Sequence, residues 1–133
     1  MVAAVNGIRY GGYPPNIAAA LSLARREIFT PVNGARGRGV LQLAVLFVTE
    51  TVSRYRSETL RQAWLAASSE ADVGIVTVSV SSFVDRQLLA SITSYPSDRN
   101  LFILTSVRNL GDLVQPIKRT VCSGATQKLY TLL

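Results

Sequence analysis

The sequence contains no histidine and a single cysteine, Cys122. Without histidine the chain cannot build a Ser-His-Asp triad or a Cys-His nucleophile pair of its own. One thiol without histidine also excludes a zinc site made of cysteine and histidine ligands. These absences exclude some of the commonest hydrolytic and zinc-dependent chemistries.

Long hydrophobic runs are also absent. The longest one, Leu43 to Val48, is far shorter than the roughly 20 residues that a membrane-spanning helix requires. The first residues, MVAAVNGIRYGG, lack the basic start and the long apolar segment of a signal peptide. The sequence therefore predicts no membrane span.

Acidic residues are few, 8 against 14 basic ones, which gives a formal net charge of +6. The basic residues are scattered and form no long run, so the simplest interpretation is a solvated basic surface. Such a balance favours acidic partners in general, whether nucleic acid, sulfated glycan or acidic protein. It does not choose among them.

What the chain does have is a regular alternation of helical and extended patterns over 133 residues, enough for one domain with one core. Apolar residues at helical spacing or in short runs predict these elements: helix 16–29, strand 41–49, helix 57–71, strand 74–80, helix 85–92, strand 101–105 and helix 109–121. This order predicts an α/β protein with a parallel sheet and right-handed crossovers.

Single residues refine this pattern. Asn16 and Asp85 are good N-caps for the first and third helices. In the first helix Ile28 falls on the apolar face, and in the second helix Trp64 does, so we expect Trp64 in the core. Pro116 lies inside the last helical segment and should kink that helix or delay its start.

The strand at 41–49 ends in the most informative part of the chain. A continuous apolar run predicts a strand buried on both faces, as in a parallel sheet. The next residues are Thr49-Glu50-Thr51-Val52-Ser53, and ligands of parallel sheets bind just beyond the carboxyl ends of strands. The oxygen-bearing side chains of this segment suggest a hard cation or a polar partner.

In order, the segments from Tyr10 to Cys122 resemble the carboxyl-terminal two thirds of a von Willebrand factor type A domain. The nearest likeness is to type VI collagen chains and related matrix proteins. The resemblance is carried by these pieces: Tyr10-Gly11-Gly12 with Asn16-Ile17, Val45 to Thr49 with Ser53, Val73 to Val78, Leu88 to Ile92 with Tyr95-Pro96-Ser97-Asp98, and Leu110 to Leu113 with Cys122. It implies a Rossmann-like, mostly parallel sheet with helices on both faces. Three of its strands are recognisable here, in a partial domain over 1–122 followed by a tail over 123–133.

The resemblance also implies binding rather than catalysis. Many family members hold Mg²⁺ in a metal-ion-dependent adhesion site made of an Asp-x-Ser-x-Ser loop, a threonine in the Gly-Gly loop and an aspartate at a strand end. This chain has no Asp-x-Ser-x-Ser, Pro15 stands where the threonine is expected, and Glu50 replaces the aspartate. Glu50 and Ser53 then look like remnants of a degenerate site, and we expect neither Mg²⁺ nor another cofactor. Glu50, Thr51 and Ser53 remain candidates for contact with a protein partner.

Partners and location follow from the same resemblance. It implies a secreted, extracellular module that binds matrix or cell-surface proteins. The alternative is a basic module that binds sulfated glycan or nucleic acid through surface arginines, although the lack of an arginine run disfavours nucleic acid. A metal-dependent α/β enzyme is a third hypothesis, and the absence of histidine and of a second convergent carboxylate argues against it.

One strand of the family pattern is missing from the sequence. In the resemblance it lies beside 41–49, so we expect this strand to have an unpaired edge, open to pairing with another chain or to aggregation. The chain is then either a piece of a larger matrix protein, or residues 1–10 or another copy complete the sheet. Cys122, a lone thiol, has either an intermolecular partner or none.

Overall fold

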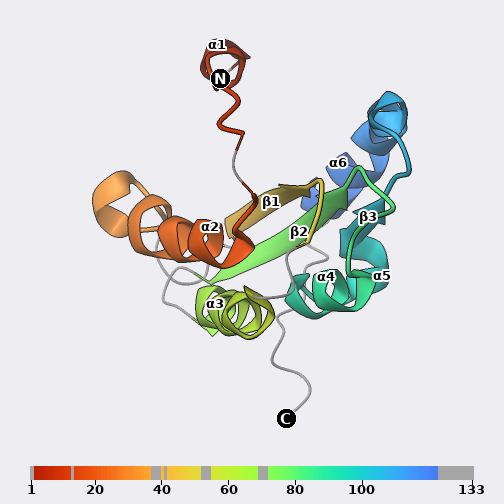
Figure 1. Ribbon diagram of the computed structural model, residues 1–133. Helices are drawn as coiled ribbons and strands as arrows, with labels where there is room; N and C mark the ends of the chain where they lie inside the picture. Colours follow the sequence, from red (N-terminus) through yellow and green to blue (C-terminus); the bar gives the residue numbers. More distant parts are fainter. Residues whose placement is uncertain are drawn as a thin grey trace.

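Three parallel strands form the centre of the molecule (Figure 1). In the computed structural model they are β1 (Gln42–Val48), β2 (Val73–Ser79) and β3 (Leu101–Ile103), paired in the order β1-β2-β3. The structure describes residues 2–12, 14–36, 40, 42–51, 55–68 and 72–122. The predicted α/β class and the predicted parallel sheet are confirmed, and β3 is two residues shorter than expected.

Helices precede, connect and follow the strands. They are α1 (Val2–Asn6), α2 (Ile17–Leu23), α3 (Arg56–Ser68), α4 (Arg86–Ile92), α5 (Ser97–Asn100) and α6 (Val114–Cys122). Helices α2, α3 and α4 pack against one face of the sheet, α6 lies behind the sheet, and α1 stands apart from the body (Figure 1). No helix in the described part of the chain is both long and apolar enough to cross a membrane.

The predicted helix caps are present. The side-chain Oδ1 of Asn16 accepts the N–H of Ala19 at 2.9 Å, and Oδ1 of Asp85 accepts the N–H of Leu88 at 2.9 Å. Each bond satisfies one of the backbone donors that a helix start leaves free. The capped helices begin where the sequence predicts.

The ends of two helices differ from the simple pattern. After α2 the chain continues as a π-helix, Ala24–Ile28, whose wider turns rotate the following residues. Ile28 is therefore 57% exposed and does not join the apolar face. Near the carboxyl end a 3₁₀-helix, Val107–Leu113, comes first, and Pro116 lies in the first turn of α6. Proline is tolerated in the first turn of an α-helix, and α6 begins at Val114 rather than at residue 109, so the predicted delay is confirmed.

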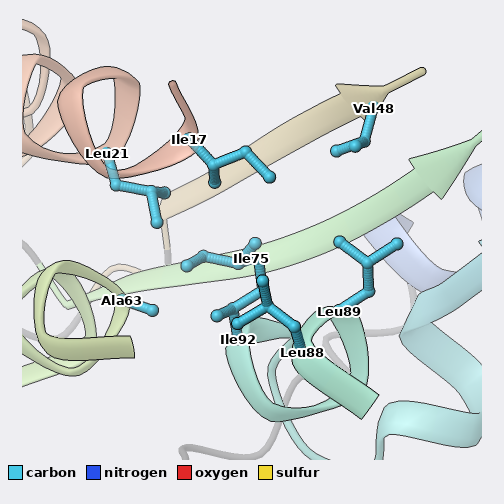
Figure 2. Packing of buried hydrophobic residues seen from close by; sticks show 8 residues of the cluster. All are labelled: Ile17, Leu21, Val48, Ala63, Ile75, Leu88, Leu89 and Ile92. Atoms are coloured by element: carbon cyan, nitrogen blue, oxygen red, sulfur yellow. The ribbon is translucent and has the colours of Figure 1, made fainter. Parts of the chain in front are cut away.

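The core lies between the sheet and helices α2, α3 and α4 (Figure 2). Every residue of β2 is buried, as expected for the central strand of a parallel sheet. The buried apolar cluster consists of Ile17, Leu21, Val48, Ala63, Ile75, Leu88, Leu89 and Ile92. Through Val48 this cluster reaches the carboxyl end of β1 and supports the segment that follows it.

Trp64 corrects one prediction, because its side chain is 56% exposed and lies outside the core. Helix α3 packs against α2 and β2 with another face, made of Thr59, Gln62, Ala63, Ala66 and Ala67. Small residues let neighbouring elements approach closely. The face of α3 that carries the alanines is therefore buried, and Trp64 is not, although Trp64 is more hydrophobic. The apolar spacing predicted the helix correctly but not which of its faces is buried.

Strand β1 corrects a second prediction, because only one of its faces is covered. Side chains alternate along a strand, and Leu46 and Val48 point to the core cluster. On the opposite face Val45 is 40% exposed and Phe47 is 61% exposed. Within the described residues β1 pairs only with β2, so its other edge has no strand partner among them.

Candidate functional site

The carboxyl edge of the sheet is where the candidate site residues gather. Past the end of β1, Thr49 and Glu50 are exposed and Thr51 is half-buried. Past the end of β2, a loop of residues 80–85 leads into α4. Parallel strands end at the same edge, so the two segments lie side by side there.

A hydrogen bond joins these two segments. The N–H of Asp85 donates to Oγ1 of Thr51 at 2.7 Å, although 34 residues separate them in the sequence. Thr51 thus positions the start of α4 against the end of β1. Its hydroxyl serves the scaffold, which is a role that the sequence did not indicate.

Asp85 extends the link to a third element. One carboxylate oxygen caps α4 through Leu88, and the other accepts a hydrogen bond from the guanidinium of Arg56 at the start of α3. The two side chains of the ion pair are 38% and 36% exposed. Because both oxygens are engaged and a positive charge lies beside them, this carboxylate is a poor ligand for a cation.

Among the described residues, few side-chain oxygens at this edge are free to bind Mg²⁺. Mg²⁺ requires about six oxygens in nearly octahedral geometry. Pro15 offers no side-chain oxygen, the hydroxyl of Thr51 already accepts a hydrogen bond, and Glu50 is exposed. Across the described ranges no three or more His, Cys, Asp or Glu side chains are grouped to hold a metal. Ser53 lies outside the described residues.

The loop after β2 presents a residue that sequence reasoning missed. Ser79 Oγ donates to the carbonyl of Ser81 at 3.1 Å, and Ser81 Oγ accepts the N–H of Phe83 at 3.0 Å. These short-range bonds fix the turn, as serine side chains often do in loops. Phe83 then projects with 86% of its surface exposed. A lone aromatic residue directly after two serines, just beyond a strand, was the signal available in the sequence.

The surface arginines are dispersed over the fold. Arg36 precedes β1 and Arg56 follows it, so they lie at opposite edges of the sheet; Arg38 and Arg54 are outside the described residues. A smaller basic group lies at α5 and α6, where Oγ1 of Thr120 donates to the carbonyl of Arg99 at 3.2 Å. This contact brings Arg99 near exposed Lys118 and Arg119. Cys122 at the end of α6 is exposed and free.

Comparison with known families agrees with this architecture. The sequence matches the family model of the von Willebrand factor type A domain over residues 1–116. The chain therefore belongs to the von Willebrand factor type A domain family. Domains of this family are in general non-enzymatic modules that bind other proteins, many of them in adhesion and matrix proteins. No curated protein gives a significant match to the chain.

Proposed function

We propose that the chain is a non-enzymatic, protein-binding module of a secreted matrix or cell-adhesion protein, of the type VI collagen kind. It binds its partner at the carboxyl edge of the sheet without a metal. One observation carries this proposal: exposed Glu50 and 86%-exposed Phe83 project from two loops that the Asp85–Thr51 hydrogen bond fastens together. Each of the two lies within two residues of that bond.

The two exposed side chains suggest how a partner is recognised. Phe83 can fill an apolar pocket, and buried aromatic anchors supply much of the affinity of protein interfaces. Glu50 can pair with a basic group and so fix the orientation of the partner. Thr51 holds the loops in place behind them, and Ser53 follows in the same segment.

The proposal leaves out a cation because of the charges at this edge. In a metal-dependent site the cation accepts a carboxylate from the partner. Here the guanidinium of Arg56 lies beside Asp85 and already neutralises the nearest carboxylate. The partner then meets Glu50 directly, which favours a basic surface on the partner over an acidic one.

A binding assay tests the proposal. Purified matrix proteins, collagens and laminins among them, are immobilised, and binding of the chain is measured with Mg²⁺ and with a chelator. We expect at least one partner whose affinity is the same in both conditions and falls at least about tenfold in Phe83→Ala, equivalent to about 1.4 kcal/mol. Trp64→Ala is the matched control, since Trp64 is also an exposed aromatic residue but lies on α3.

Two results would overturn the proposal. The first is binding that requires Mg²⁺ or Mn²⁺ and disappears with the chelator. The second is binding to heparin that decreases steeply with salt and is lost in Arg99→Ala or Arg119→Ala but not in Phe83→Ala. The second result would establish the sulfated-glycan alternative, which the group of Arg99, Lys118 and Arg119 favours.

A further inference from the structure

Among the described residues, no strand lies beside the outer edge of β1, which presents a row of backbone groups. Val80 donates its N–H to the carbonyl of Val48 at 3.2 Å, so the backbone groups of Val48 point toward β2. Backbone direction alternates along a strand, so the backbone groups of Leu43, Val45 and Phe47 point the other way, toward the edge that does not face β2. In the described part of the chain no other strand pairs with β1.

This edge lacks the features that usually protect exposed strands. Soluble proteins guard such edges with charged residues, proline, bulges or very short strands. From Val40 to Thr49 the sequence has no charge and no proline, and the β1–β2 register runs without a bulge through seven residue pairs. Val45 and Phe47 are also among the exposed large hydrophobic residues. The edge therefore has the properties of an interaction surface.

We propose that β1 pairs with β1 of a second copy of this chain, antiparallel and centred on Val45. In this register Val45 lies opposite Val45 of the other copy, and Phe47 lies opposite Leu43. All three residues direct their backbone groups outward, so each pair can exchange both of its hydrogen bonds. Their side chains share one face, and aromatic and β-branched cross-strand pairs stabilise antiparallel ladders. The outward-facing residues of β1 can therefore pair with the same residues of a second copy.

The charges at the two ends of β1 select a second copy in this orientation. Arg36 is exposed before the strand, and Glu50 is exposed after it. Antiparallel pairing places the acidic end of each copy beside the basic end of the other. Parallel pairing would place Glu50 beside Glu50 and Arg36 beside Arg36, which costs free energy. The sheet would then continue through the dimer in the order β3-β2-β1-β1-β2-β3.

Sedimentation equilibrium tests the association with the full chain. We expect a dimer, at twice the 14.4 kDa mass of the chain, that Val45→Lys converts to monomer. The substitution places two ammonium groups directly opposite each other at the centre of the ladder. Val32→Lys is the control, because Val32 is 95% exposed on another segment and should leave the dimer intact. Circular dichroism verifies that both variants fold.

Disulfide cross-linking tests the register without disturbing the strand. In a Cys122→Ser background, Val45→Cys should form a covalent dimer under mild oxidation, since directly opposite residues have Cα atoms about 5.5 Å apart, within disulfide range. Phe47→Cys alone should not cross-link, because the two copies of residue 47 would lie about 13 Å apart. A monomeric wild type, a dimer that resists Val45→Lys, or equal cross-linking of the two cysteine variants would each overturn the proposal.

Discussion

At the scale of single residues, Asp85 connects three segments at the carboxyl edge of the sheet. It caps α4, pairs with Arg56 and, through its N–H, binds Thr51. We expect Asp85→Ala to lower the free energy of unfolding by about 1–2 kcal/mol, mostly from the lost cap, because a half-exposed ion pair adds less than about 1 kcal/mol. Urea denaturation measures the change.

Asp85→Asn separates the two contributions. Asparagine caps helices about as well as aspartate but carries no charge, so this variant should lose well under half as much stability as Asp85→Ala. Equal losses in the two variants would contradict the assignment of the stability to the cap. Equal losses would show instead that the ion pair with Arg56 supplies most of the stability that Asp85 contributes.

Glu58 gives a prediction about pH. A hydrogen bond from Gln62 at 2.7 Å and the nearby charge of Arg61 hold the pKa of Glu58 below its usual value of 4.5. The folded state thus favours the ionised form, and this stabilisation is complete above the unfolded pKa and is lost as the pH falls through the lower folded pKa. Glu58→Gln should flatten the acid limb of a plot of melting temperature against pH. An unchanged acid limb would show that Glu58 is not coupled to folding.

Sequence reasoning at the residue scale succeeded where the cause is local. The caps Asn16 and Asp85 were predictable because a cap bonds a backbone group three residues away. The pairing of Asp85 with Arg56 was not, since the two residues are 29 apart and meet only when the sheet forms. Phe83 was missed because its importance rests on exposure, which no local pattern reports.

At the scale of elements, β2 is the strand on which the core depends. Ile75 is fully buried in the cluster between the sheet and the helices (Figure 2). We expect Ile75→Ala to lower the free energy of unfolding by about 2–5 kcal/mol, because the truncation removes packed methyl groups and leaves a cavity. Ile28→Ala is the matched control at a residue that is 57% exposed, and it should change stability by less than about 0.5 kcal/mol. Chemical denaturation compares the two, and similar losses would contradict the described core.

The helices and strands were largely predictable from the sequence, but which of their faces are buried was not. Apolar runs and helical spacing are encoded within single segments, so the three strands and the main helices were found. Which face of α3 is buried depends on what packs against it, and for that reason Trp64 was misplaced. The prediction that β1 is buried on both faces was wrong for the same reason. The sequence of a strand does not specify which elements cover its two faces. The predicted tail over 123–133 lies outside the described residues.

At the scale of the whole molecule, the family and the charges at the carboxyl edge of this sheet lead to different expectations about cations. The family architecture places a binding edge at the carboxyl ends of the strands, where many members use Mg²⁺. In this chain the described part of that edge carries the Arg56–Asp85 ion pair and the exposed carboxylate of Glu50. The affinity of a protein interface depends on buried anchors and packing, so a surface of this kind can bind a protein without a metal ligand.

Thermal unfolding with and without cations tests whether the folded chain binds a divalent cation. A cation that binds only the folded state and is present at 100 times its dissociation constant would add about 2.7 kcal/mol, a rise of several degrees in melting temperature for a domain of this size. We expect Mg²⁺ or Mn²⁺ at about 10 mM, compared with a chelator, to change the melting temperature by less than about 1 °C, because the edge offers too few free oxygens. A rise of several degrees that Glu50→Ala abolishes would contradict this expectation and restore Glu50 as a metal ligand. A rise that Glu50→Ala leaves unchanged would place cation binding elsewhere and leave the metal-free binding edge intact.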